Sequence, residues 1–325
     1  MATPGTHSNY FAELSNPGAL SVLVPNMGSM TELSYYAAQS RMTEPGCRAE
    51  LLTGLPGDIA ELRRVVSGLV IHYRADKPME KGVPAERMRE IDTRYAETML
   101  GRLAELADGP LSTPRSATER LVGCCRDFTV LYVSALRARG IPARARVGFA
   151  TYFVADYAID HEVAEVWDTD QARWRLIDAE IDEGHTSPAG TRVDPLDLTP
   201  DQFVLAGAAW QQCRRVLADP TSFVVDPGLD VPETRGWPQI AHDLVQDLAA
   251  LNSTEMLLWD GWGWGDGRRF TDAEHELLDR VAAVTTAGDG EDARKLYENE
   301  TSLRVPDTVT SADPLGGPDR HIAWR

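Results

Sequence analysis

The feature that most constrains the fold is a change in the spacing of apolar residues midway along the chain. Apolar side chains first recur with the period of a helix. Gly140 ends this predicted helix, and Pro142 prevents its continuation. From Ala143 onward they alternate at every second residue, as in half-buried strands, with a short turn at 168–172 that makes a hairpin. The predicted strands span 143–153, 161–168 and 173–181. A helix followed by a meander of strands predicts an α+β fold rather than a doubly wound parallel sheet.

Helices are also predicted on both sides of this segment. They span 31–42, 58–72, 84–103, 200–217, 236–251, 271–286 and 290–299. The glycine-rich stretch 259–267 and the tail from Pro306 are expected to be irregular. We therefore expect three regions: a loosely ordered arm at 1–30, a core at 31–182, and a mostly helical extension at 183–325 that packs on the core.

The charge balance argues against two classes of partner. Asp and Glu number 50 against 32 Lys and Arg, for a net charge of −18, so neither nucleic acid nor an anionic membrane surface is expected to bind. No apolar run reaches the roughly 18 residues of a membrane helix, and the first residues lack the features of a signal peptide. The four cysteines show neither metal spacing nor a disulfide framework. We expect a reduced, cytoplasmic protein without a metal or cofactor.

Three short segments carry residues suited to nucleophilic catalysis: 123–128 at a helix start, 160–166 on a strand, and 174–178 on the next strand. The free N–H groups and the dipole at a helix N-terminus stabilise a cysteine thiolate. An imidazole can accept the thiol proton, and a carboxylate beside the imidazole fixes its tautomer. Adjacent antiparallel strands would place His161 beside Asp178.

The same segments resemble the transglutaminase-like superfamily. The superfamily's G-x-C-R-D-F motif is similar to GCCRDF here, and its R-x-x-GIPAR helix end is similar to RARGIPAR. Its strand that opens with histidine is similar to DHEVAEV, and its strand that ends in aspartate is similar to RWRLID. The resemblance implies a papain-like core in which a helix carrying the cysteine packs on an antiparallel sheet, with additional helices at both ends. It also implies a triad of Cys125 as nucleophile, His161 as base and Asp178 as orienting acid.

The motif register favours Cys125 over Cys124 as the nucleophile. Cys125 occupies the third position of the motif and begins the apolar stripe of the helix, whereas Cys124 points about 100° away. The helix start and the nearby histidine are expected to hold the pKa of the Cys125 thiol well below about 8.5. The sequence departs from many relatives at Glu162 and Val163, because those relatives carry a tryptophan just after the histidine.

Four further residues are candidates for substrate binding, although core packing or a solvated surface position would explain each of them as well. They are Tyr152, His185, Trp259 and Trp262. The sequence HEVAE at 161–165 is not a zinc motif, because it lies on a strand and lacks the second histidine.

The sequence therefore predicts an enzyme that transfers acyl groups through a cysteine. Cys125 would attack an amide or thioester carbonyl and form a thioester acyl-enzyme, with its own backbone N–H as one oxyanion donor. Water as acceptor would make the enzyme an amidase or peptidase, whereas an amine would give amide synthesis. The expected substrate is a small-molecule or carrier-bound acyl group, and the oligomeric state stays open. The alternative is a catalytically silent transglutaminase-like module that binds a partner.

Overall fold

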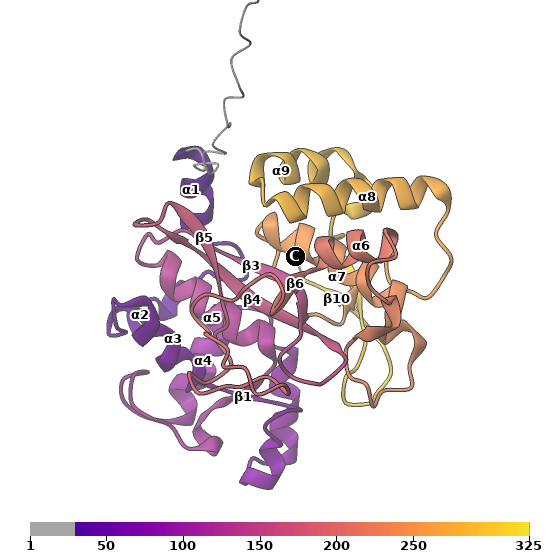
Figure 1. Ribbon diagram of the computed structural model, residues 1–325. Helices are drawn as coiled ribbons and strands as arrows, with labels where there is room; N and C mark the ends of the chain where they lie inside the picture. Colours follow the sequence, from indigo (N-terminus) through magenta and orange to yellow (C-terminus); the bar gives the residue numbers. More distant parts are fainter. Residues whose placement is uncertain (1–29, 325) are drawn as a thin grey trace, which may run out of the picture.

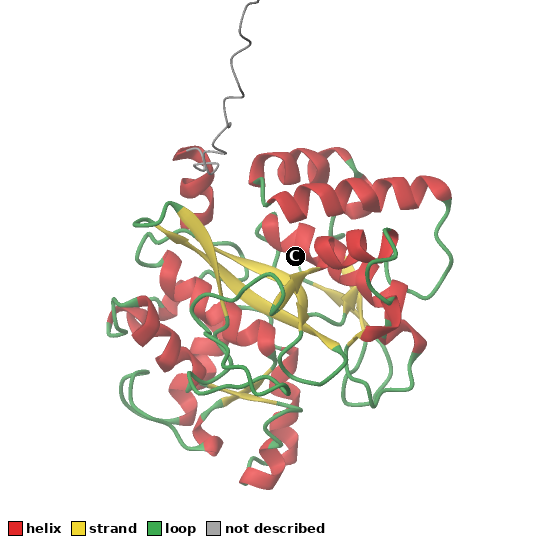
Figure 2. Ribbon diagram, in the orientation of Figure 1, coloured by secondary structure: helices red, strands yellow, loops and turns green. Residues whose placement is uncertain are grey.

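A computed structural model describes residues 30–324 and has the α+β architecture that the sequence predicts (Figures 1 and 2). The strands of its central sheet are β3 (Ala143–Ala150), β4 (Ala158–Asp168), β5 (Arg173–Ile177), β6 (Phe203–Leu205) and β7 (Phe223–Val224). Their order is β5-β4-β3-β6, with β7 beside β4. All pairs run antiparallel except β7, which is parallel to β4. The arm predicted for residues 1–30 lies, apart from residue 30, outside the described residues.

Helices cover both sides of this sheet, as Figures 1 and 2 show. They are α1 (Met30–Ala37), α2 (Glu50–Thr53), α3 (Ile59–Ser67), α4 (Ala96–Leu106), α5 (Cys125–Arg137), α6 (Ala206–Arg214), α7 (Gly236–Leu251), α8 (Asp272–Ala287) and α9 (Gly290–Asn299). Short 3-10 helices span Gly46–Arg48, Pro78–Lys81, Ala85–Asp92, Ala117–Glu119, Pro220–Ser222, Pro232–Thr234 and Thr301–Leu303. In the described part of the chain, no helix is both long enough and apolar enough to cross a membrane.

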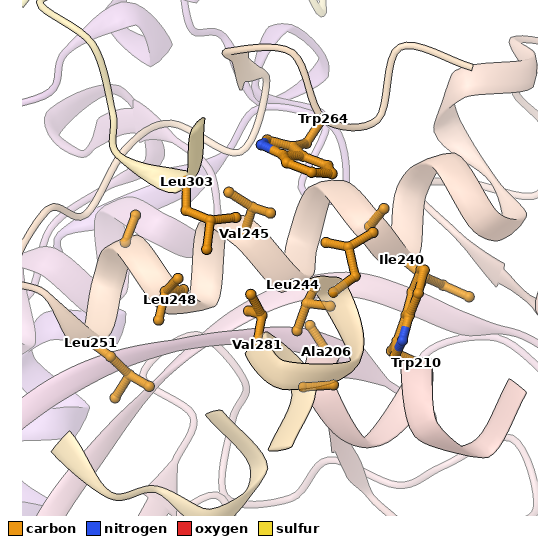
Figure 3. Close-up of a cluster of buried hydrophobic side chains, with 14 of the residues drawn as sticks. Ala206, Trp210, Ile240, Leu244, Val245, Leu248, Leu251, Trp264, Val281 and Leu303 are labelled. Carbon is orange, nitrogen blue, oxygen red and sulfur yellow. The ribbon is translucent and has the colours of Figure 1, made fainter. Parts of the chain in front are cut away.

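Two hydrophobic cores hold these layers together. One joins α3, α4 and α5 to the face of β4 and β5 that carries Ala164 and Ile177. The other joins α6, α7, α8 and α9. In Figure 3, Leu244 of α7 lies close to Val281 of α8 and Ala206 of α6. The sheet is therefore enclosed between helices from both halves of the chain.

Strand β3 is buried along its whole length, whereas the alternating pattern predicted a half-buried strand. Its arginines supply the polar positions of that pattern, and both are buried in an ion-pair network. The Arg146 guanidinium donates two 2.9 Å hydrogen bonds to Asp247 of α7, and Glu165 of β4 accepts hydrogen bonds from Arg144 and Arg146. Because every charge in this group has a partner, removing one of them would leave another charge buried and unpaired and would weaken the packing of α7 on the sheet.

The predicted helix at 58–72 ends earlier than expected. Asp58 caps α3 by accepting the Glu61 N–H, but the helix stops at Ser67 and the next residues form strand β1 (Val70–His72). This strand pairs in parallel with β2 (Leu121–Gly123), directly before α5. Local periodicity cannot reveal a strand whose partner lies about fifty residues further along the chain.

Three other predicted helices are also shorter. In place of one helix at 84–103, a 3-10 helix over Ala85–Asp92 precedes α4, because the extended backbone at Thr93 separates the two. The helix predicted at 31–42 stops at Ala37, and the one predicted at 200–217 begins only after strand β6.

Both segments expected to be irregular contribute strands. These are β8 (Asp260–Gly261), β9 (Thr308–Ser311) and β10 (Arg320–Ala323), which form an antiparallel sheet in the order β10-β9-β8. Asp260 is held there by two hydrogen bonds from the Arg94 guanidinium, at 2.7 and 3.1 Å. The prediction of irregular structure was therefore wrong for β9 and β10 in the tail and for the two residues of β8, because tertiary pairing outweighed the local glycine and proline content, whereas residues 262–267 are irregular as predicted.

The region predicted as a C-terminal extension also enters the central sheet. Strand β6 pairs with β3, and β7 pairs with β4, so both elements lie directly beside the strands of the predicted core. The boundary at residue 182 stays a prediction.

A glycine in β3 provides a test of this packing. Gly148 pairs with both His161 and Leu205, and a Cβ added there would lie 2.3 Å from the Val204 carbonyl oxygen. Gly148→Ala is expected to lower the free energy of unfolding by about 1–3 kcal/mol, because the β6 backbone must shift. Urea denaturation measures this loss. Gly184→Ala is the control, since nothing lies within 4 Å of its added Cβ; equal stability of the two variants would contradict the packing of β6.

Candidate active site

The start of α5 is fixed by backbone and side-chain contacts around the two adjacent cysteines. Cys124 is the N-cap residue, and Cys125 is the first helical residue. The Cys124 N–H donates to Asp127 Oδ2 at 2.9 Å, and the Arg126 guanidinium donates to Asp127 Oδ1 and to the carbonyl of Glu255. The motif's Arg-Asp pair thus holds the helix start and anchors it to the segment after α7.

Glycine is required directly before the cysteine pair. A Cβ added to Gly123 would lie 2.7 Å from Asp127 Oδ2 and 2.9 Å from a Val70 methyl group. The close approach of β1 and of the capping carboxylate leaves no room for a side chain there. The first position of the motif therefore follows from the packing of the helix start.

Both thiols are buried and interact with each other. Cys125 packs against Val147 and Leu258, and its thiol forms a hydrogen bond with Cys124. That hydrogen bond, then burial, then the charges of Cys124, Glu180 and Asp160 raise the pKa of Cys125 well above its ordinary value. The expectation of a lowered pKa for Cys125 was therefore wrong, because the sequence did not reveal these neighbours.

His161 and Asp178 are brought together across the β4–β5 pair. The register Ala164↔Ile177 sets the two residues diagonally on one face of the sheet, and His161 Nε2 lies 2.9 Å from Asp178 Oδ2. Burial alone would lower the pKa of His161, but the charge and hydrogen bond of Asp178 raise it above 6.5. Burial opposes ionisation of Asp178 as well, yet the charge of His161 and the surrounding donors lower the Asp178 pKa to about 2.

Asp178 is held by three further donors. Tyr152 donates its hydroxyl to Oδ2 at 2.6 Å, while the backbone N–H groups of Glu180 and Ile181 donate to Oδ1 at 2.7 and 3.3 Å. With both oxygens occupied, the carboxylate cannot turn away from the imidazole. His161 Nδ1 has no hydrogen-bond partner among the described residues, so it is free to exchange a proton with another group.

One cavity of about 1240 Å³ joins these groups. Cys124, Cys125 and His161 all line it, while Asp178 lies behind His161 and does not. Thr129, one turn after Cys125, donates its hydroxyl to the carbonyl of Glu162 at 3.0 Å and so fastens α5 to β4 next to His161. The structure thus places the predicted nucleophile and the predicted base on the wall of the same cavity.

The four predicted substrate-binding residues divide into two pairs. Trp259 and Trp262 are half-buried and line the cavity. Tyr152 is instead 1% exposed and donates to Asp178, so its contacts position the carboxylate. His185 lies edge-on to Tyr152, with its Nε2 3.1 Å from the Tyr152 carbonyl oxygen, and neither residue lines the cavity.

Other cavity residues were missed from the sequence. His72 was expected to end a helix but lies on β1 and lines the cavity, where burial lowers its pKa to about 4. Asp160 and Glu180 also line it, and their only sequence signal is proximity to the motif residues His161 and Asp178. Within residues 30–324, no cluster of three or more His, Cys, Asp or Glu side chains is arranged to hold a metal ion.

The ion pair predicts a specific dependence of stability on acid. Because its pKa is lowered from 3.8 to about 2, Asp178 stabilises the fold by about 2 kcal/mol above pH 5, and this contribution is lost as the pH falls toward 2. His161 stays protonated throughout this window, since its pKa is raised. The difference in unfolding free energy between the wild type and Asp178→Asn should therefore shrink from about pH 5 to pH 2. Urea denaturation across this range measures it; a constant difference would contradict the ion pair.

Comparison with known families agrees with this geometry. Residues 76–179 match the model of the family described as Transglutaminase-like superfamily. The matched range contains Cys125, His161 and Asp178, so the resemblance stated from the sequence motifs is confirmed. This part of the chain is transglutaminase-like, and its fold is a cysteine-bearing helix packed on an antiparallel sheet.

Similarity to individual proteins is weaker. A solved structure described as a "Putative Cysteine Protease" from Cytophaga hutchinsonii is similar at 16% identity and a TM-score of 0.31. The likeness covers 51% of this chain and 46% of that chain, so this chain spans less than half of the length of that protein. The comparison with curated proteins gives no match.

Proposed function

We propose that the protein is a cysteine-dependent acyltransferase or amidase that works through a thioester acyl-enzyme. The observation that carries this proposal is the shared cavity wall: the Cys125 thiol at the start of α5 and His161, oriented by Asp178, border one space. A nucleophile, a base and an orienting carboxylate are the three roles that this chemistry requires.

In the proposed reaction, Cys125 attacks the carbonyl carbon of an amide or thioester while its proton passes to His161. Because Cys125 is the first residue of α5, its backbone N–H has no partner within the helix and can donate to the oxyanion. The imidazolium then protonates the leaving amine or thiol, which leaves the acyl group on Cys125. Water or an amine attacks this thioester, returns its proton to the thiol through His161, and releases an acid or an amide.

The raised pKa of Cys125 shapes this mechanism. A thiol whose pKa lies above its ordinary value is neutral at pH 7, so proton transfer to His161 accompanies attack on the bound substrate. The same observation favours a second candidate, a binding module that uses the cavity without acyl transfer. Such a module needs no reactive thiol.

The cavity supports a small-molecule or carrier-bound acyl substrate. Its volume of about 1240 Å³ exceeds the roughly 300–1,000 Å³ of ordinary ligand pockets, so a long substrate arm would fit. Its walls are aromatic and acidic, which disfavours nucleic acid as a ligand. Because the four cysteines are all free, we infer a reducing compartment such as the cytoplasm as the place of action.

Intact-mass spectrometry distinguishes the two candidates. The full chain is mixed with a panel of small amides and thioesters and quenched in acid, with and without an added primary amine. An acyltransferase or amidase gains the mass of one acyl group, and the released product shows whether water or the amine is the acceptor. If substrates bind but no acyl mass appears in any mixture, the binding module is the better description.

A further inference from the structure

The charged side chains of the cavity are almost all acidic. Its carboxylates are Asp160, Glu180, Asp226, Glu233, Asp266 and Asp313, and Arg74 is the only Lys or Arg among the described lining residues. Three of these acids already have a cationic partner: Asp226 lies 3.4 Å from Arg74, Asp313 2.7 Å from Arg89, and Asp266 3.5 Å from Arg268. The cavity therefore holds acidic groups that no basic side chain neutralises.

Asp160 and Glu180 are the two unneutralised acids beside the reacting groups. Asp160 directly precedes His161 on β4, and Glu180 lies two residues after Asp178. Each has one carboxylate oxygen that is buried without a hydrogen-bond partner, and no Lys, Arg or His nitrogen of residues 30–324 forms an ion pair with either. Both side chains are only half-buried and line the cavity, so a ligand there can reach them and supply the positive charge that the neighbouring side chains do not.

We propose that the cavity binds a substrate bearing an ammonium group, with Asp160 and Glu180 as its acceptors and Trp259 and Trp262 against its apolar part. An ammonium group has three donors and no acceptor, which complements two carboxylates. The aromatic side chains supply apolar surface, and the face of an indole ring also attracts a cation. Trp262 is fixed for this role, since its Nε1 donates to the Leu303 carbonyl at 3.3 Å.

The pKa shifts of the two acids agree with this assignment. Burial raises the pKa of Asp160 to about 7, although the positive charges of His161 and Arg74 lower it. Burial likewise raises the pKa of Glu180 to about 8. The charge of His161 lowers this pKa, and the charges of Asp178 and Asp76 raise it further. An ammonium group would favour the ionised form of both acids. It would also offset the two charges that help to keep the Cys125 thiol protonated.

Calorimetric titration of the full chain with three matched ligands tests the proposal: phenethylammonium, neutral 2-phenylethanol and anionic 3-phenylpropionate. The ammonium ligand should bind at least about tenfold more tightly than the alcohol, and the carboxylate most weakly. Asp160→Asn and Glu180→Gln should each remove most of this preference. Asp226→Asn is the matched control, because that acid is already paired with Arg74, and it should keep the preference.

Equal binding of the ammonium ligand and the alcohol by the wild-type chain would overturn the proposal, and this result does not depend on whether any variant folds. A preference that survives in both folded variants would overturn the assignment to Asp160 and Glu180.

The inference rests on the proposed function only in using the same cavity, and the two can fail separately. Preferential ammonium binding without any acyl-enzyme supports the inference and contradicts the function. Acyl-enzyme formation without preferential binding of the ammonium ligand supports the proposed function and contradicts the inference. Adding phenethylammonium to the acyl-enzyme shows which substrate bears the cation: formation of its amide identifies the acceptor, whereas inhibition without consumption identifies the acyl donor.

Discussion

Replacing Cys125 by alanine is expected to abolish the acyl-enzyme and to lower turnover by a factor on the order of 10³ to 10⁶, as for other enzymes that lose their nucleophile. Cys125 is the first residue of α5 and lines the cavity with His161, so its sulfur is the atom that would carry the acyl group. Steady-state kinetics and intact-mass measurement on the same samples check both parts of the expectation.

Cys124→Ala is the matched control for this experiment. Cys124 is adjacent, similarly buried and lines the same cavity, but it is the N-cap residue rather than the first helical residue. The variant should retain most of the turnover. It should also react faster with iodoacetamide at neutral pH, because the hydrogen bond that raises the Cys125 pKa is lost. If Cys124→Ala is inactive and Cys125→Ala is active, the roles of the two cysteines are reversed.

Replacing Asp178 by asparagine is expected to lower kcat by a factor of about 10² to 10⁴ while the protein stays folded at neutral pH. The carboxylate accepts from His161 Nε2, and this bond leaves Nδ1 as the proton acceptor. An asparagine amide can present its NH₂ group to Nε2 instead, which stabilises the other tautomer. The pH profile of kcat/KM should also shift to lower pH, because the pKa of His161 is no longer raised by the carboxylate.

Asp168→Asn provides the comparison for this variant. Asp168 ends β4 in the same hairpin and pairs with Arg175 at 3.2 Å, but it does not line the cavity. Its replacement should leave kcat and the pH profile almost unchanged. If Asp178→Asn behaves like Asp168→Asn, Asp178 does not position the base.

The fold was predictable where the local pattern and the tertiary pairing agree. The period change at residues 140–143 marked the end of α5 and the start of β3, and the hairpin of β4 and β5 followed from its short turn. It was not predictable where the pairing is remote. Strand β1 pairs with β2, and β9 with β8, across about fifty residues each, and no apolar period records such contacts.

The site was predictable to a similar degree. The motif residues Cys125, His161 and Asp178 were predicted as a triad because their types and order match a known family, and the structure brings His161 and Asp178 into contact. The hydroxyl of Tyr152 on Asp178 could not be foreseen, since it depends on how the chain turns after β3. The raised pKa of Cys125 was missed for a related reason: it comes from burial and from neighbours that meet only in the folded chain.

In the proposed mechanism, Cys125 carries the acyl group as a thioester. Peptide mapping of the acid-quenched acyl-enzyme by tandem mass spectrometry, before and after treatment with neutral hydroxylamine, tests it most directly. We expect one acyl group on Cys125 that hydroxylamine removes, and none on Cys47, Cys124 or Cys213. An acyl group on Cys124, or one that hydroxylamine does not release, would contradict it.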